Sequence, residues 1–141
     1  MQDFELENFL PYLLNLAAEA SSLEFKQVYK DRYGLLRNDW RVLFHLGLYG
    51  NLTSSDIAAR AKMHKTKISR AVHRLAERRF LTRTRDEKDR RLEHLQLTKI
   101  GEAAYRDLRN IAKNYDAGLV EDMSPKEVEL LKTLLHRLAE R

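Results

Sequence analysis

Basic side chains are concentrated in one stretch of the 141-residue sequence, between Arg60 and Arg91. This stretch holds thirteen lysines and arginines against four acidic residues, a net charge of +9, whereas the whole chain carries +5 and the remainder therefore −4. A basic block in an otherwise slightly acidic protein is the electrostatic footprint expected for a partner rich in phosphate groups. A surface that is merely solvated usually mixes both signs. The chemistry indicated is the binding of a polyanion.

The sequence offers little for catalysis or for metal binding. It contains no cysteine, which excludes disulfides, thiolate metal sites and cysteine-based redox sensing. The five histidines form no short metal-ligand motif, and neither a glycine-rich phosphate loop nor a nucleophile–base pair can be recognised. A metal site assembled from distant elements is a minor alternative. We therefore predict no enzyme, no cofactor and no metal site.

The elements that must position the basic residues follow from the pattern between Thr53 and Leu97. Thr53 with Asp56 predicts a capped start for one short helix. A second helix is predicted over about 65–79 because apolar residues recur there at helical spacing, facing inward: Ile68, Ala71, Val72 and Leu75. Apolar residues on both sides of the charged loop 86–91 predict a β-hairpin. This order predicts a winged helix-turn-helix over 38–97.

The outward side chains of this motif are the predicted DNA contacts. Residues near the start of the second helix enter the major groove first. Arg70 can bond guanine O6 and N7 through two N–H groups, so we expect it to read a base, with Lys65, Lys67 and Arg74 on phosphates. The start of the first helix can offer backbone N–H groups to phosphate. The predicted DNA-binding residues are Thr53, Ser54, Lys65, Thr66, Lys67, Ser69, Arg70, His73, Arg74, Lys88, Arg90 and Arg91.

At the tip of the hairpin, two adjacent arginines can reach the minor groove beside the recognition helix. Arginine reads the width and the negative potential of that groove more than its sequence. Asp86 and Asp89 would repel phosphate, so we expect them to pair with Arg91 or Lys88 and stiffen the loop. We expect Arg90 to enter the minor groove and Arg91 to stabilise the loop through its pairing with an aspartate.

The two ends of the chain, 1–36 and 99–141, predict amphipathic helices. A long helix is expected over 8–33, capped by Asn8 and ended by Gly34, and a shorter one over 39–46, capped by Asn38. Helices over 99–122 and from Pro125 onward follow the hairpin. Their wide apolar stripes favour pairing with a second copy of the chain, although a monomeric helical core remains an alternative. A two-fold dimer would place two recognition helices about 34 Å apart, which suits a palindromic operator.

Length and composition predict a single mainly α domain over 1–141, with a small β-hairpin wing and N- and C-terminal dimerisation helices. The N-terminus is acidic where a signal peptide would be basic, and no apolar run approaches the roughly 20 residues that span a bilayer. We therefore expect no membrane partner and a location in the cytoplasm.

Taken together, these motifs resemble the MarR family of transcriptional regulators over nearly the whole chain. The resemblance rests on NDWRVLFHLG, on DIAARAKMHKTKISRAVHRLAERRFLTR, on the wing DEKDRR and on the LT-x-x-G at Leu97, Thr98 and Gly101. Lys88 replaces the first arginine of the family's wing pattern, and Lys62 stands where the turn often has glycine. The resemblance implies an obligate dimer that represses nearby genes and is often released by a small ligand.

In this family, ligands often bind where the dimerisation helices meet the DNA-binding region. The residues that could line such a crevice here are Tyr12, Tyr33, Trp40, Arg41, Phe44 and His45. Aromatic rings with one cation suit a phenolic or aromatic carboxylate effector, although Trp40 and Phe44 at helical spacing also suit a plain core. Two other functions stay open: a winged-helix scaffold for protein partners, which should be poor in surface arginine, and a non-specific nucleic-acid binder.

Overall fold

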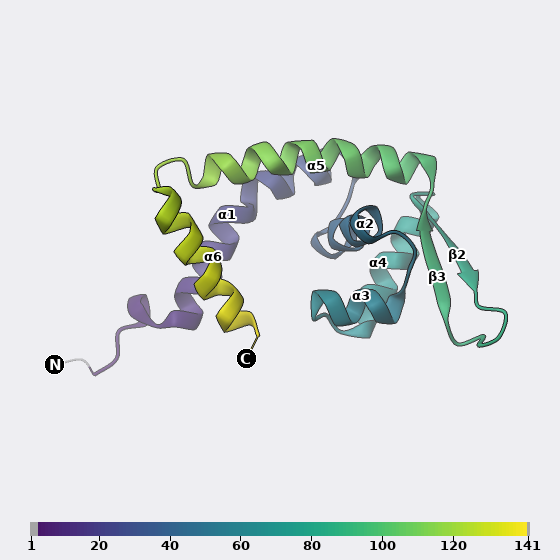
Figure 1. The fold of residues 1–141 in the computed structure, drawn as a ribbon, viewed down its shortest axis with the longest axis horizontal. Coiled ribbons are helices and arrows are strands. Elements are labelled where there is room, and N and C mark those ends of the chain that lie inside the picture. The colour runs from purple at the N-terminus through teal and green to yellow at the C-terminus, as the bar shows by residue number, and fades with distance from the viewer. Residues whose placement is uncertain (1–2, 141) are drawn as a thin grey trace. The chain divides into compact units, whose positions relative to one another are not determined.

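The computed structural model describes residues 3–140 as a mainly helical chain that divides into two compact units, one ending at Asn110 and one beginning at Ile111 (Figure 1). The helices of the first unit are η1 (Leu6–Asn8), α1 (Leu10–Tyr33), α2 (Arg37–Tyr49), α3 (Ser54–Ala61) and α4 (Lys65–Glu77). The strands are β1 (Leu52–Thr53), β2 (Leu81–Arg85) and β3 (Glu93–Leu97), followed by α5 (Lys99–Leu119) and α6 (Pro125–Ala139). Among these helices, none has the length and apolar character needed to cross a membrane. The predicted winged helix-turn-helix is confirmed.

Two of the predicted helix caps are wrong. Phe9, not Asn8, is the N-cap of α1, and the Asn8 side chain instead donates a hydrogen bond to Glu5 in the short helix η1. The N-cap of α2 is Leu36 rather than Asn38. The carboxylate of Asp39, in the first turn of α2, accepts the Leu36 backbone N–H at 2.9 Å. A side chain in the third helical position can therefore accept the N–H of the N-cap residue, even when that N-cap residue is apolar.

The helix-turn-helix follows its predicted pattern closely. Thr53 and Asp56 form the capping box of α3, with hydrogen bonds of 3.0 and 3.1 Å. The turn passes through Lys62 in the left-handed conformation (φ 53°), the geometry that glycine adopts most readily. His64 caps α4, which ends at Glu77, two residues earlier than predicted, because Arg79 also has a positive φ of 64°.

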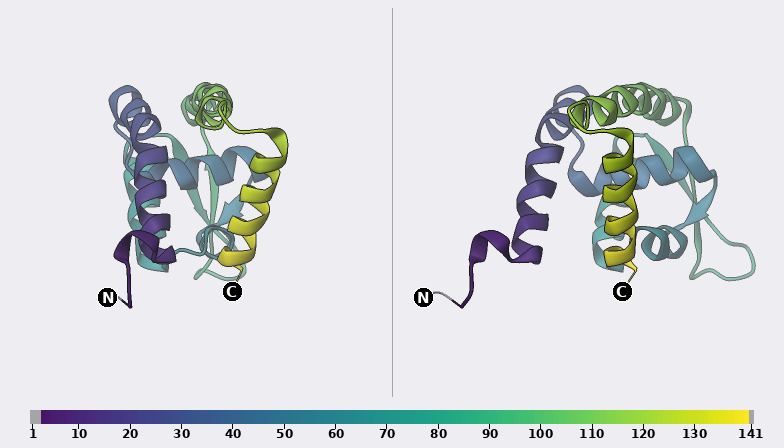
Figure 2. Two further views of the ribbon diagram at one scale, coloured as in Figure 1. Left: turned by 90° about the vertical axis from the view of Figure 1, so that its left-hand side faces the viewer. Right: turned by 60° about the vertical axis from the view of Figure 1, so that its left-hand side comes forward.

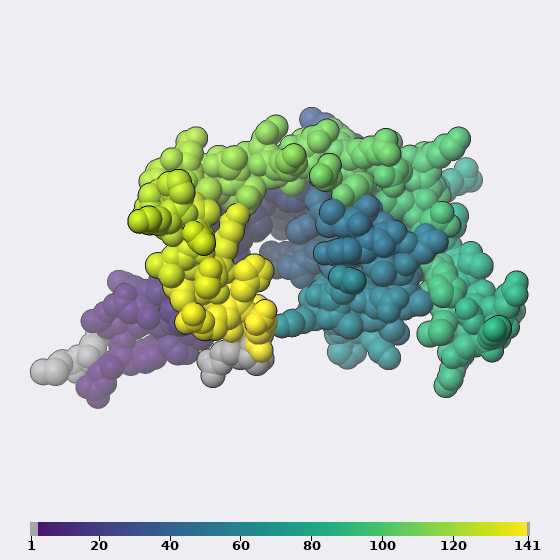
Figure 3. Space-filling view, viewed as in Figure 1, coloured from purple at the N-terminus to yellow at the C-terminus, as the bar shows by residue number. Residues whose placement is uncertain are grey.

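The wing belongs to a three-stranded antiparallel sheet with the order β1-β3-β2. The hairpin β2–β3 pairs Leu81 with Leu97 and Arg85 with Glu93. The two-residue strand β1, which the sequence did not predict, pairs Leu52 with Leu95 and so joins the wing to the start of α3. In Figures 1 and 2 the tip of the hairpin extends beyond α3 and α4, and it stands out from them in the space-filling view of Figure 3.

The core of the first unit lies behind the helix-turn-helix. All four inward residues predicted for α4 are buried, together with Leu43 of α2, Ile57 of α3 and Leu95 of β3. Helix α5 passes close to the end of the recognition helix at Gly101, where an added Cβ would lie 1.9 Å from the Phe80 carbonyl oxygen. This close approach requires glycine and holds α5 on the base of the wing.

Large apolar side chains of the terminal helices are exposed in each unit considered by itself. On α1 and the residue before it these are Phe9, Leu10, Leu13, Leu16 and Leu23. In the second unit, α6 begins at the predicted capping box of Ser124 and Glu127 and buries none of its residues. Helix α5 ends at Leu119, three residues before the predicted end. Apolar surface of this extent is characteristic of an interaction face.

Candidate nucleic-acid interface

The outer face of α4 presents exposed polar and cationic side chains from its first two turns: Lys65, Thr66, Lys67, Ser69 and Arg70. The opposite face is buried in the core, so rotation of the helix about its axis is prevented. The start of the helix is fixed because His64 Nδ1 accepts the Thr66 backbone N–H at 3.2 Å. Within residues 3–140, neither a hydrogen bond nor an ion pair is recorded for the Arg70 side chain. Arg70 can therefore engage an external group.

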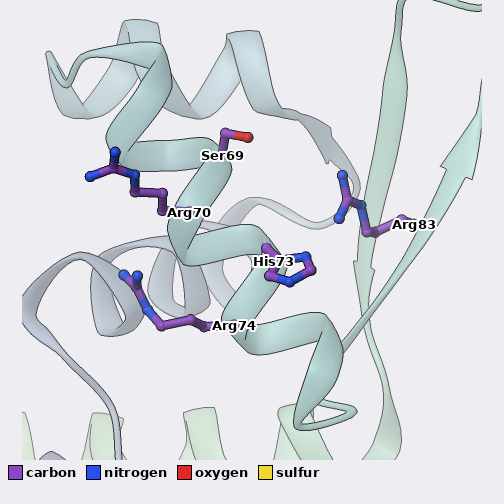
Figure 4. Close-up of a pocket in the computed structure, with 5 residues that line it drawn as sticks. All are labelled: Ser69, Arg70, His73, Arg74 and Arg83. Atoms are coloured by element: carbon purple, nitrogen blue, oxygen red, sulfur yellow. The ribbon is translucent and has the colours of Figure 1, made fainter.

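Arg70 borders a shallow hollow of about 340 Å³ between the recognition helix and the wing. Ser69, His73 and Arg74 of α4 line it on one side, and Arg83 of β2 lines it on the other (Figure 4). The hollow therefore brings together four of the predicted DNA-binding residues and one that the sequence analysis did not single out. Most of its lining side chains are nitrogen bases or cations, which suits an anionic partner.

Two of the predicted contacts on α4 already have partners within the protein. Nε and Nη2 of Arg74 lie 2.9 and 2.8 Å from Oδ1 of the buried Asp39. His73 Nε2 lies 3.1 Å from a Glu77 oxygen one turn further along the helix. The structure thus differs from the expectation that Arg74 is available to phosphate, because its guanidinium neutralises a carboxylate that has almost no access to water.

Arg83, the residue that sequence reasoning missed, is also paired. Its Nε and Nη2 donate to the two oxygens of Glu93 at 2.9 and 2.8 Å across the hairpin. The hydrogen bonds from Arg83 lower the pKa of Glu93, and the same contact raises the pKa of Arg83. The available signal was the hairpin register, which sets Arg83 and Glu93 diagonally across neighbouring strands.

The wing tip is braced much as the sequence suggested. Asp89 accepts hydrogen bonds from the Arg91 side chain, which lower the pKa of the Asp89 carboxyl. Asp86 departs from the expectation: it pairs with His94 at 2.9 Å and accepts the backbone N–H groups of Lys88 and Asp89. The His94 hydrogen bond is the main cause of a lowered Asp86 pKa. Arg90 is exposed, and no interaction of its side chain is recorded in the described part of the chain.

The predicted phosphate contact at the start of α3 is altered by the capping box. The Thr53 backbone N–H, which we expected to face phosphate, donates to the Asp56 carboxylate at 3.0 Å. The Thr53 hydroxyl accepts the Asp56 N–H at 3.1 Å and can still donate its own hydrogen. Ser54, the first residue of α3, is half-buried. The capping box therefore uses the Thr53 backbone N–H inside the protein, and a phosphate contact at Ser54 stays a prediction.

Four of the six predicted effector residues line a single hollow. Trp40, Arg41, Phe44 and His45 of α2 border a space of about 310 Å³ with Leu48, Tyr49 and Ala61. Burial lowers the pKa of Arg41, whose carbonyl accepts a hydrogen bond from His45 Nδ1 at 2.6 Å. The rings of Trp40 and Phe44 also pack edge to face, with their centroids 5.2 Å apart, as rings in a protein core do.

The two predicted tyrosines lie elsewhere. Tyr12 lines a separate hollow with residues that precede α1. The Tyr33 hydroxyl donates to Asp107 of α5 at 2.5 Å, and burial together with this contact raises the Tyr33 pKa to about 12. Neither belongs to the hollow beside Trp40. In the single chain, Tyr12 and Tyr33 thus lie apart from the other four, and a common ligand site for the six residues stays a prediction.

Comparison with known proteins agrees with the fold. The MarR family model matches residues 33–92, which include the helix-turn-helix and most of the wing. Over these residues the chain resembles the MarR family. The HTH-type transcriptional regulator FarR of Neisseria gonorrhoeae is 27% identical over 124 residues, covering 87% of this chain and 84% of FarR.

Two solved structures extend the similarity to the whole MarR fold. BpsR of Bordetella bronchiseptica has a TM-score of 0.89 at 21% identity. Its structure addresses how 6-hydroxynicotinic acid regulates DNA binding by BpsR. That match covers 99% of both chains. MepR of S. aureus, solved as a complex with DNA, has a TM-score of 0.84 at 20% identity, covering 94% of this chain and 97% of MepR. The chain therefore has the fold of MarR-family transcriptional regulators.

Proposed function

We propose that this protein is a homodimeric regulator that binds a palindromic operator in double-stranded DNA and represses nearby genes until a small aromatic effector releases it. The observation that carries the proposal is the outer face of α4, where Lys65, Lys67 and Arg70 are exposed on a helix fixed by its buried face. Such a helix can enter the major groove with its N-terminal turns leading. The similar protein MepR was solved as a complex with DNA, which supports DNA as the partner.

The terminal helices support the homodimer. Exposed leucines on α1, the exposed Phe9 just before it, and a helix α6 without buried residues give each unit apolar surface that one subunit leaves in water. A second copy would cover it, because a two-fold dimer presents the same patch on both subunits. The dimer would repeat the α4 face and the wing, and so double every DNA contact.

The hollow beside Trp40 supports a small acidic effector. Arg41 supplies the cation for a carboxylate, and the rings of Trp40, Phe44 and Tyr49 suit a planar aromatic body. The similar protein BpsR responds to 6-hydroxynicotinic acid, a compound of this chemical class. We expect the protein to act in the cytoplasm, where a prokaryotic operator is accessible.

The test is a titration of a fluorescent duplex from the gene's own promoter, repeated over a range of salt concentrations and against a scrambled duplex. We expect promoter binding about a thousandfold tighter than scramble binding and a steep loss of affinity with salt. A steep loss without the preference would indicate a non-specific binder. No binding to either duplex at low salt would refute the DNA function and favour a protein-interaction scaffold.

Light scattering tests the dimer, and 6-hydroxynicotinic acid tests the effector. A monomeric mass at the concentrations used for binding would contradict the dimer. Matched titrations with and without the acid test release, and the Arg41→Met variant should bind DNA normally but lose any response to the acid.

A further inference from the structure

A single carboxylate joins the start of α2 to the recognition helix. Asp39 is 2% exposed, and its Oδ2 accepts the Leu36 N–H that closes the first turn of α2. Its Oδ1 accepts both Nε and Nη2 of Arg74 on α4. Because both oxygens are used, the Asp39 side chain has one orientation, and the Arg74 guanidinium is held with it.

Arg74 stands one helical turn after Arg70 on α4, and both border the hollow between the recognition helix and the wing (Figure 4). Removing Arg74 from Asp39 would leave a buried carboxylate without a counter-ion, which is costly. A phosphate must compete with that pairing, whereas Arg70 has no recorded protein partner. The two arginines are therefore chemically different although their spacing in the sequence makes them look equivalent.

The C-terminal end of α4 is tied to a different helix. Arg78 Nη1 donates to the Tyr33 carbonyl at the end of α1 at 2.6 Å, and the Tyr33 hydroxyl donates to Asp107 of α5. Arg74 and Arg78 thus fasten the same end of α4 to α2 and to α1. The N-terminal turns, which carry the exposed cations, have only the His64 cap and the buried face to hold them.

We propose that Arg74 is a positioning residue: its ion pair with Asp39 sets the angle at which α4 presents Arg70 to the base pairs, and Arg74 remains on Asp39 when DNA is bound. This inference rests on the proposed DNA-binding function. It assigns sequence preference to a partly buried ion pair that touches no base, because a tilted recognition helix would misplace Arg70 relative to the base pairs.

The sign of the effect distinguishes positioning from phosphate contact. If Arg74 contacts phosphate and Asp39 only restrains it, Asp39→Asn should strengthen binding and Arg74→Met should weaken it. If the pair positions α4, both variants should lower the preference for the best duplex over a scrambled one by about tenfold, the effect of one mismatched base pair. The double variant should then be no worse than either single variant, because both remove the same interaction.

Matched controls separate positioning from general loss of charge or stability. Glu102→Gln and Arg106→Met break an exposed pair at 3.4 Å on α5 with the same chemical changes, and they should leave the preference unchanged. Arg74→Lys keeps the charge but loses the planar fork, so it should behave like Arg74→Met. It also serves if Asp39→Asn fails to fold.

The duplex is first selected from a random pool by the parent protein. The affinity of each variant for this duplex and for a scrambled one is then measured below the variant's unfolding temperature. Each affinity is measured over a range of salt concentrations. The expected result is a parallel loss of preference in Asp39→Asn and Arg74→Met with an unchanged salt slope. Opposite effects, or a slope reduced by about 0.9 per contact in Arg74→Met alone, would overturn the proposal.

Failure of the parent protein to enrich any duplex would instead contradict the proposed function. The positioning of α4 is then tested by amide hydrogen exchange. Asp39→Asn and Arg74→Met should speed exchange over 65–77 to the same extent, without an effect in the Glu102 and Arg106 controls. Unchanged exchange in this segment would overturn the inference independently of DNA.

Discussion

The wing supplies a prediction that separates two neighbouring arginines. Arg91 is held by Asp89 through two side-chain hydrogen bonds, whereas no partner of the Arg90 side chain is recorded in residues 3–140. We therefore expect Arg90 to enter the minor groove and Arg91 to brace the loop. Arg90→Ala should remove one phosphate-region contact per subunit, or two per dimer, and lower the slope of log affinity against log salt by about 1.8.

That slope has a measurable consequence. A fourfold rise in salt should weaken the parent protein about 12-fold more than Arg90→Ala, while the ranking of operator sequences stays the same. Arg91→Ala is the matched control and should change the slope less, because its guanidinium is already paired. Fluorescence anisotropy at four or more salt concentrations gives both slopes. Equal slopes for the parent and Arg90→Ala would refute the assignment of Arg90 to the groove.

Three further predictions address the recognition helix, the base of the wing and the end of α1. Arg70→Ala should relax discrimination at one base pair per half-site by about 1–3 kcal/mol in competition titrations, and equal weakening on all sequences would instead make Arg70 a phosphate contact. Gly101→Ala should lower the free energy of unfolding by about 1–3 kcal/mol in denaturant titrations, because the added Cβ meets the Phe80 carbonyl oxygen. Gly118 has open space around it, so the control Gly118→Ala should be neutral or stabilising. The Tyr33 pKa is raised from 10.0 to about 12, so the stability that the protonated hydroxyl contributes is complete below pH 10 and is lost as the pH rises toward 12. The free energy of unfolding of the parent should therefore fall over this pH range more than that of Tyr33→Phe. Parallel pH profiles for the two proteins would contradict this.

The recognition helix could be predicted from the sequence because its signal is local. The four apolar residues from Ile68 to Leu75 recur at helical spacing, and their burial follows from that period alone. The capping boxes at Thr53 and Ser124 are local as well, since each joins residues three apart. The ends of α1 and α2 were harder to predict. A polar residue near a helix start suggests an N-cap, but Asp39 supplied the hydrogen bond from inside the helix.

The contacts that define the interface could not be predicted from the sequence because they join distant residues. Arg74 meets Asp39 across 35 positions, and nothing in the spacing of α4 distinguishes Arg74 from Arg70. Strand β1 has two residues, too few to carry a period, and forms because β3 offers it an edge. The hydrogen bond from the Tyr33 hydroxyl to Asp107 of α5 likewise joins residues 74 positions apart.

The most direct test of a sequence-specific dimer is selection from a random duplex pool followed by sequencing of the bound fraction. A dimer that inserts two copies of α4 in successive major grooves should enrich inverted repeats whose half-sites are centred about 10 base pairs apart. Arg70→Ala should relax the same position in both half-sites. Enrichment of a single unrepeated motif would contradict the dimeric reading of DNA, and a bound fraction with no enriched motif would contradict sequence-specific binding by α4.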